Sequence, residues 1–193
     1  MTAGPGATRR RFVLLDRDGT INEEVGHLSD VADLRLIPGS ADAIRRLRSA
    51  GLGVVVVTNQ ANVGRGLLGL DGLEDIHARL RAMLGAEGAQ VDAILHCPHA
   101  PEDGCDCRKP RTGMAIEAAD RFSFDLSQAY VIGDHAGDAG MGRAIGATTI
   151  LVLTGHGVEE RERAEREELA DHIVPDLAAA ADIITALEER EAM

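Results

Sequence analysis

Short apolar segments rich in β-branched residues alternate with helical patterns along most of this chain. The segments that we predict as strands are 12–15, 53–57, 91–95, 129–132 and 149–153. The segments that we predict as helices are 40–50, 73–84, 114–122, 138–145, 159–169 and 176–190. Strands that are apolar on both faces are typical of a parallel sheet that helices cover on both sides. The alternation therefore predicts an α/β fold, a three-layer Rossmann-like parallel sheet with helices on both faces.

The length of the chain limits the number of domains, and its net charge limits the classes of molecule that it can bind. We predict that residues 1–10 form a disordered tail and that residues 11–193 form a single domain. The 20 basic and 32 acidic residues leave a net charge of −12, which disfavours binding to nucleic acid or to an anionic membrane. No apolar run approaches the roughly 18 residues that span a bilayer. We therefore expect a cytoplasmic monomer that acts on a small molecule.

Polar side chains stand just past the ends of three of the predicted strands. Asp16, Thr58 and Asp134 come from distant parts of the chain, but the carboxyl ends of parallel strands meet at one edge of a sheet. In Asp16-Arg-Asp-Gly-Thr20, two nearby carboxylates can divide the work, since one can attack or bind a metal while the other moves protons. Taken alone, an acidic turn explains this pair as well, and a helix-capping loop explains Thr58-Asn-Gln60.

Two further features point to the same edge. Lys109 is the single lysine among 20 basic residues, which indicates either a need for a compact ammonium group there or chance. Asp134 follows the fourth predicted strand and can complete an oxygen-rich magnesium site with Asp16. We interpret Asp138 as an acid at the start of the next helix, where it is favourable, rather than as a water-mediated metal ligand.

Together these groups resemble the motifs of the haloacid dehalogenase superfamily of phosphohydrolases, from Phe12 to about Leu153. The resemblance implies that Asp16 is the nucleophile that forms an aspartyl-phosphate and that Asp18 is the general acid and then the base. It also implies that Thr58 and Lys109 hold the phosphoryl oxygens. Mg²⁺ would be bound by Asp16, Asp134 and the main-chain carbonyl of Asp18.

A cysteine-containing loop lies just before Lys109. Cys97-Pro-His99 and Cys105-Asp-Cys107 form two closely spaced ligand pairs, and this arrangement suits tetrahedral zinc with three thiolates and one imidazole. Buried free cysteines are the alternative, but the stretch is too polar for a core, and His96 is a competing ligand. With no open position for water, the zinc would be structural and would pin the loop that carries Arg108 and Lys109.

This loop is similar to that of the zinc-containing branch of the superfamily, whose members dephosphorylate heptose bisphosphate or histidinol phosphate. The resemblance implies a phosphomonoesterase that removes the 7-phosphate of D-glycero-D-manno-heptose 1,7-bisphosphate. The alternatives are a histidinol-phosphate phosphatase and a non-catalytic zinc-stabilised binding protein. The substrate contacts that it implies are Glu24, Val25, Gly26, His27, Asn59, Gln60, Ala61, Arg108 and His135. His135 stands where heptose bisphosphate enzymes usually have lysine.

The spacing of the motifs also predicts an open site. The intervals 16–58 and 58–109 are largely filled by predicted helix and strand, so neither has room for a separate cap domain. We therefore expect a pocket rimmed by residues 22–37 and by the zinc loop. We interpret His77, which lies among charged residues of a helix, as a surface residue, and His156 as part of a loop.

Overall fold

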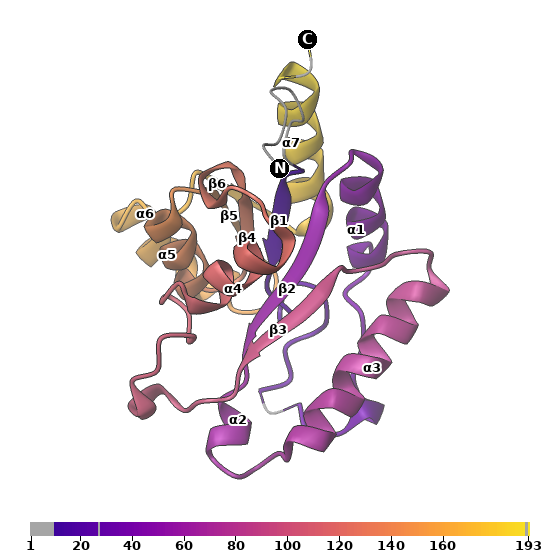
Figure 1. Ribbon diagram of the computed structural model, residues 1–193, viewed down its shortest axis with the longest axis vertical. Helices are drawn as coiled ribbons and strands as arrows, with labels where there is room; N and C mark the ends of the chain where they lie inside the picture. The colour runs from indigo at the N-terminus through magenta and orange to yellow at the C-terminus, as the bar shows by residue number, and fades with distance from the viewer. Residues whose placement is uncertain (1–9, 27, 192) are drawn as a thin grey trace, which may run out of the picture.

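Six parallel strands form one sheet in a computed structural model that describes residues 10–26, 28–191 and 193 (Figure 1). Residues 1–9 of the expected tail lie outside the described residues. The order across the sheet is β3-β2-β1-β4-β5-β6. The strands are β1 (Phe12–Leu15), β2 (Gly53–Asn59), β3 (Ala93–Cys97), β4 (Tyr130–Gly133), β5 (Thr148–Val152) and β6 (His172–Val174). This is the doubly wound order of a Rossmann-like fold, as the alternation predicts.

The helices connect these strands. They are α1 (Ser40–Ser49), α2 (Ala61–Gly64), α3 (Leu70–Ala86), α4 (Gly113–Phe122), α5 (Ala136–Ile145), α6 (Gly157–Arg166) and α7 (Leu177–Glu191). Three short 3₁₀ turns are η1 (Val31–Asp33), η2 (Pro101–Asp103) and η3 (Leu126–Gln128). All six predicted helices are present. The prediction missed β6 and α2, because three and four residues are too few to show a hydrophobic period.

Apolar side chains fill both faces of the sheet. On one face, Val13 and Leu15 of β1 belong to a core that includes side chains of α1, α3 and α7. On the other, Phe12 and Leu14 belong to a core that includes side chains of α4 and α5. Successive side chains of a strand point to opposite faces, so the unbroken apolar run of β1 supplies both cores. The predicted three layers are confirmed.

His77 does not lie at the surface as we expected. It projects from α3 toward the sheet, is 1% exposed, and sits beside the buried residues Leu73, Ile76 and Leu80 of the same helix. The charged residues around it in sequence, Glu74 among them, fall on the exposed face of the helix. Residues that are adjacent in sequence can lie on opposite sides of a helix, so charged neighbours do not show that a residue is exposed.

The order of the strands places an edge crevice between β1 and β4. Strand order reverses there, and in open parallel sheets a ligand binds outside the carboxyl ends of the strands at this point. Asp16 directly follows β1 and Asp134 directly follows β4. The described residues of the intervals 16–58 and 58–109 hold η1, α1, β2, α2, α3, β3 and η2 but no separate cap domain. Within the described part of the chain, no helix is both long and apolar enough to cross a membrane.

Candidate active site

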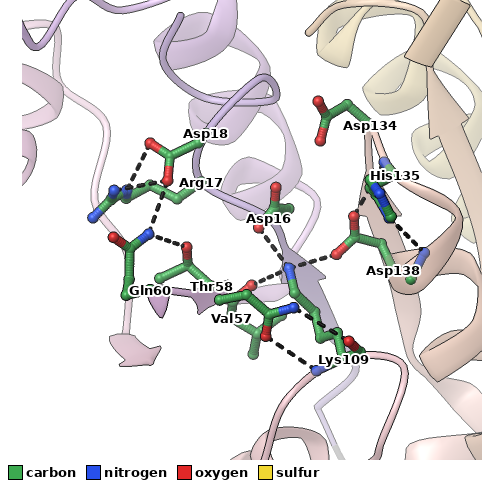
Figure 2. Close-up of polar contacts among 12 residues, drawn as sticks. Asp16, Arg17, Asp18, Val57, Thr58, Gln60, Lys109, Asp134, His135 and Asp138 are labelled. Carbon is green, nitrogen blue, oxygen red and sulfur yellow. Dashed lines mark hydrogen bonds and ion pairs between the residues drawn. The ribbon is translucent and has the colours of Figure 1, made fainter. Parts of the chain in front are cut away.

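Lys109 is the centre of a buried charge cluster at the carboxyl edge of the sheet (Figure 2). Its Nζ lies 2.5 Å from Asp16 Oδ1, 2.5 Å from Asp138 Oδ1 and 2.7 Å from the carbonyl oxygen of Val57. Burial lowers the pKa of Lys109, but the carboxylates of Asp138 and Asp16 outweigh it and raise that pKa above its ordinary value. Lys109 is therefore a charged ammonium group at neutral pH.

Asn59 fixes the backbone from which Lys109 projects. The Asn59 amide nitrogen donates to the Lys109 carbonyl at 3.2 Å, and the Lys109 amide donates to Asn59 Oδ1 at 3.0 Å. Asn59 is the last residue of β2, so this pair of hydrogen bonds attaches the end of the cysteine loop to the sheet. The loop and the strand together aim the ammonium group at Asp16.

Three carboxylates crowd the same site. Oxygen atoms of Asp16, Asp134 and Asp138 lie within 4.8 Å of one another, and all three residues are buried. Burial raises the pKa of Asp16 to about 6, against the opposing pull of Lys109. Burial and the charge of Asp16 raise the pKa of Asp134 to about 8. One ammonium group faces three crowded carboxylates, and oxygen ligands of this kind suit a hard divalent cation such as Mg²⁺, which would relieve their repulsion.

Two glycines make room for the Asp134 carboxylate. A Cβ atom on Gly19 or on Gly155 would lie 2.1 Å from Asp134 Oδ2, and both glycines have positive φ angles. The same oxygen accepts a hydrogen bond from the His156 backbone at 2.8 Å. Backbone from two loops therefore packs closely on this carboxylate, and a side chain at either glycine would displace it.

Asp138 does more than we expected of it. It does belong to the first turn of α5, where Oδ2 accepts from the His135 backbone at 3.2 Å. Its other oxygen pairs with Lys109, and the side chain is buried in the site. The interpretation of Asp138 as only a helix-start acid is therefore incomplete. The sequence does not show that the first turn of α5 faces a lysine from another part of the chain.

Asp18 lies in a separate network beside Asp16. Arg17 donates to it twice, from Nε at 3.0 Å and from Nη2 at 2.7 Å, and the Asn22 amide donates at 2.9 Å. The Gln60 amide donates to Asp18 Oδ2 at 2.9 Å and to Thr58 Oγ1 at 2.8 Å. Burial opposes ionisation of Asp18, but the Arg17 guanidinium and these hydrogen bonds hold its pKa below the ordinary value. Asp18 is therefore ionised at neutral pH.

The predicted zinc ligands converge at the end of β3. Cys107 Sγ lies 3.0 Å from Cys97 Sγ, 3.5 Å from Cys105 Sγ and 3.2 Å from His99 Nδ1. Cys97 Sγ lies 3.5 Å from Cys105 Sγ and 3.6 Å from His99 Nδ1. Ligands of a tetrahedral zinc ion are about 3.5–3.8 Å apart, as its bond lengths require. The four side chains are thus close to a tetrahedron and fit zinc.

His96 does not compete for this position. It precedes Cys97 in β3, so its side chain points to the opposite face of the sheet. There its ring centroid lies 5.5 Å from that of His77 in α3. The group of cysteine and histidine ligands in the described residues therefore contains His99 and not His96.

A pocket of about 260 Å³ opens above the charge cluster. Among the expected substrate contacts, those that line it are Glu24, Gly26, Asn59, Gln60, Ala61, Arg108 and His135. Val25 is 47% exposed and does not line the pocket, and His27 lies outside the described residues. Asn59 and Gln60 reach the pocket, but their amides hold Lys109, Asp18 and Thr58. The expected rim formed by residues 22–37 is present in the lining residues Glu24, Gly26 and Leu28.

Arg65 was not singled out in the sequence, and His156 was interpreted only as part of a loop, yet both line the pocket. Arg65 follows α2 directly and His156 precedes α6. The Nδ1 atom of His156 lies 3.5 Å from Asp134 Oδ2, so this loop histidine does reach the site. The only signal for either residue is that it stands a few positions after a strand at the active edge.

Known proteins are similar to this chain over most of its length. The family model described as "HAD-hyrolase-like" matches residues 106–180. A D-glycero-beta-D-manno-heptose-1,7-bisphosphate 7-phosphatase of Pseudomonas putida is 41% identical over 172 residues, which cover 89% of this chain and 97% of that protein. A D-glycero-D-manno-heptose-1,7-bisphosphate 7-phosphatase of Thermosynechococcus vestitus is 40% identical over 187 residues, with coverage of 91% and 95%.

A solved structure matches as well. The D,D-heptose 1,7-bisphosphate phosphatase of B. bronchiseptica, crystallised with magnesium and phosphate, superposes with a TM-score of 0.85. It is 36% identical in sequence, and the match covers 90% of this chain and 97% of that one.

Proposed function

The chain belongs to the haloacid dehalogenase-like hydrolases, in the family of the heptose-1,7-bisphosphate 7-phosphatases, and we propose that it removes the 7-phosphate of D-glycero-D-manno-heptose 1,7-bisphosphate. The observation that carries this proposal is the buried cluster in which Asp16 meets Lys109, Asp134 and Asp138 at the carboxyl edge of the sheet. A binding protein needs no nucleophile beside a buried ammonium group, whereas a phosphatase does.

In the proposed reaction, Asp16 attacks phosphorus and the bond to the sugar oxygen breaks, with the proton for the leaving oxygen coming from Asp18. The product on the protein is an aspartyl-phosphate at Asp16. Asp18 then accepts a proton from the water molecule that attacks this intermediate, which releases inorganic phosphate and restores Asp16. The ammonium of Lys109 and the hydroxyl of Thr58 hold the phosphoryl oxygens throughout.

The environment of Asp18 suits the second half of this reaction. Paired with Arg17, Asp18 is ionised at rest and can take a proton from water. For the first half it must be protonated, and the negative charge of an arriving phosphate ester favours that by raising its pKa. The bond from Gln60 ties this carboxylate to Thr58, so the proton-transfer group and a phosphate ligand are held together.

Mg²⁺ completes the proposed site. Asp16 and Asp134, with the main-chain carbonyl of Asp18, would hold it, and Asp138 lies close enough to support it. When bound, Mg²⁺ neutralises phosphoryl oxygens and so makes phosphorus more open to attack. The fit rests on the crowded carboxylates, and Gly19 and Gly155 allow the carboxylate of Asp134 to take its place among them.

Structural zinc is part of the same proposal. Cys97, His99, Cys105 and Cys107 would hold it, and the segment that follows Cys107 carries Arg108 and Lys109 into the pocket. A closed four-ligand site stabilises a loop and leaves no position for catalysis. Reduced cysteines used as metal ligands are typical of the cytoplasm, and we propose a cytoplasmic enzyme that acts as a monomer on a small sugar phosphate.

The test is phosphate release from D-glycero-D-manno-heptose 1,7-bisphosphate, with histidinol phosphate measured in parallel. We expect the heptose substrate to be preferred, ³¹P spectra to show that the phosphate at position 7 is the one lost, and the Asp16→Asn variant to be inactive. Equal and slow release from both substrates, or normal turnover by Asp16→Asn, would contradict the proposal.

A further inference from the structure

His77 of α3 is a buried imidazole that lacks hydrogen bonds. It is 1% exposed, and its Nε2 atom has no hydrogen-bond partner among the described residues. Its Nδ1 atom lies 3.6 Å from Glu74 Oε1, which is longer than a hydrogen bond. Buried polar groups normally have a partner, since an unpaired one costs free energy. We therefore expect His77 to bind something other than the protein atoms that surround it.

Two further side chains with metal-binding atoms lie beside His77. Glu74 precedes it by one turn of α3, and His96 comes from β3. One ligand atom from each of Glu74, His77 and His96 lies within 4.8 Å of the other two. The ring centroids of the two histidines are 5.5 Å apart. Two imidazoles on one tetrahedral ion have centroids about 5 Å apart when the metal–nitrogen bonds are about 2.1 Å long, so small side-chain rotations would bring all three ligands onto one ion.

The chemistry of these ligands suits a transition metal rather than Mg²⁺. First-row dications such as Zn²⁺, Co²⁺ and Ni²⁺ bind well to imidazole and carboxylate together, whereas Mg²⁺ prefers oxygen ligands alone. Burial and the charge of Arg17 lower the pKa of His77 to about 3, so its ring is neutral at neutral pH, which is the form that binds metals. Arg17 is itself paired with Asp18 at 2.7 Å, and Glu74 provides a negative charge for the ion.

The three residues lie outside the active site and the cysteine cluster. None of them lines the pocket above Asp16. His96 directly precedes Cys97 in β3, but successive side chains of a strand point to opposite faces of the sheet. The side chain of Glu74 is 62% exposed, so an ion can enter from solvent on that side. Three protein ligands leave at least one coordination position for water.

We propose that Glu74, His77 and His96 bind a first-row transition-metal dication at a site of its own, apart from the Mg²⁺ and zinc sites of the proposed function. The bound ion joins α3 to the end of β3. It stabilises the folded chain, because the unfolded chain does not hold the three ligands together. The site does not depend on the proposed activity, so a different substrate would leave it unaffected.

Co²⁺ is the probe, added to enzyme that is already loaded with zinc and kept in excess Mg²⁺. Thiolate ligands give Co²⁺ an intense charge-transfer absorption that imidazole and carboxylate ligands do not, so the spectrum distinguishes this site from the cysteine cluster. Equilibrium dialysis and elemental analysis count the bound ions. Any Co²⁺ at the carboxylates of the active site is common to all variants, so the difference between wild type and variant counts only the proposed site.

We expect wild type to bind one more Co²⁺ ion per chain than Glu74→Gln or His96→Gln, without the thiolate absorption. The affinity of this ion should fall at least about 100-fold in either variant, since even the loss of a second-shell partner costs about 10- to 100-fold. The Tm of wild type should rise with Co²⁺ concentration, and that rise should be smaller in both variants. Asp75→Asn is the matched control with wild-type binding, because Asp75 is an exposed acid of the same helix outside the cluster.

Equal Co²⁺ binding by wild type, Glu74→Gln and His96→Gln would refute the proposal and would leave a buried water molecule as the partner of His77. Loss of the ion in Asp75→Asn as well would also refute it, because that would indicate a general effect of negative charge on α3. Glu74 is exposed, so Glu74→Gln decides the question even if His96→Gln does not fold.

Discussion

Replacement of Lys109 by methionine tests the buried charge cluster directly. Methionine keeps the length of the side chain but removes the ammonium group that lies 2.5 Å from both Asp16 and Asp138. Removal of one partner from a buried ion pair costs about 3–5 kcal/mol, because the remaining charge is left without compensation. We expect a loss of that size in the free energy of unfolding at pH 8, and a fall of about 10²–10³ in kcat from the loss of one electrostatic stabiliser.

The loss of stability in Lys109→Met should depend on pH, and the raised pKa of Asp16 determines in which direction. Burial raises the pKa of Asp16 in the folded protein to about 6, above the ordinary value of 3.8, even with Lys109 present. An acid whose pKa is raised by folding destabilises the folded state as pH rises through that pKa, since its ionised form is disfavoured there. Without the ammonium group the pKa of Asp16 rises further. The loss of stability in Lys109→Met is therefore largest above pH 6 and shrinks as pH falls toward 4.

Urea unfolding of wild type and Lys109→Met at pH 5, 6.5 and 8, followed by circular dichroism in buffer without Mg²⁺, measures this difference. The double variant Lys109→Met/Asp138→Asn removes one of the stranded carboxylates and should recover part of the loss. Arg79→Met serves as the exposed control. A loss below about 1 kcal/mol at pH 8, or one that does not change with pH, would refute the assignment of Lys109 to a buried ion pair.

Three further measurements test other parts of the site. Because burial raises the pKa of Asp134 to about 8, Mg²⁺ must displace a proton below that pH. Its affinity, measured by titration calorimetry, should therefore rise up to about tenfold per pH unit between pH 6 and 8, and a flat profile would contradict this. Gln60→Met removes the bonds to Asp18 and Thr58 and should lower kcat about tenfold with little change in Tm, whereas wild-type kcat would show that this link is dispensable. Wild type should carry one zinc ion per chain by elemental analysis and Cys105→Ser should lose it, so retention of zinc in that variant would exclude the four-ligand site.

Much of the fold could be predicted because its signals are local. The unbroken apolar run of β1 indicates a strand that is covered on both faces, and the register of β1 between β2 and β4 agrees with that. Elements shorter than one hydrophobic period, such as β6, show no such signal and form only because a neighbouring strand offers hydrogen bonds. His77 was misplaced for the related reason that burial depends on which side of α3 faces the sheet.

The contacts between side chains within the site could not be predicted from the sequence. Asp138 follows Lys109 by 29 positions, and nothing near either residue in sequence indicates that they meet at 2.5 Å. Gln60 was expected to touch substrate, yet the folded chain directs its amide to Asp18 and Thr58. Arg65 gave only a weak signal, its position a few residues after β2, because the pocket that it lines is built from segments far apart in the chain.

The amino-acid sequence by itself determined which chemical groups are present and which strand each of them follows. That was enough to predict the sheet, the carboxylates of Asp16 and Asp134 at its edge, Lys109 and the grouping of Cys97, His99, Cys105 and Cys107. The folded structure alone decided which charges neutralise each other and which remain free. Electrostatic energy depends on distance and burial in space, and packing brings together at 2–3 Å groups that the chain separates by dozens of residues.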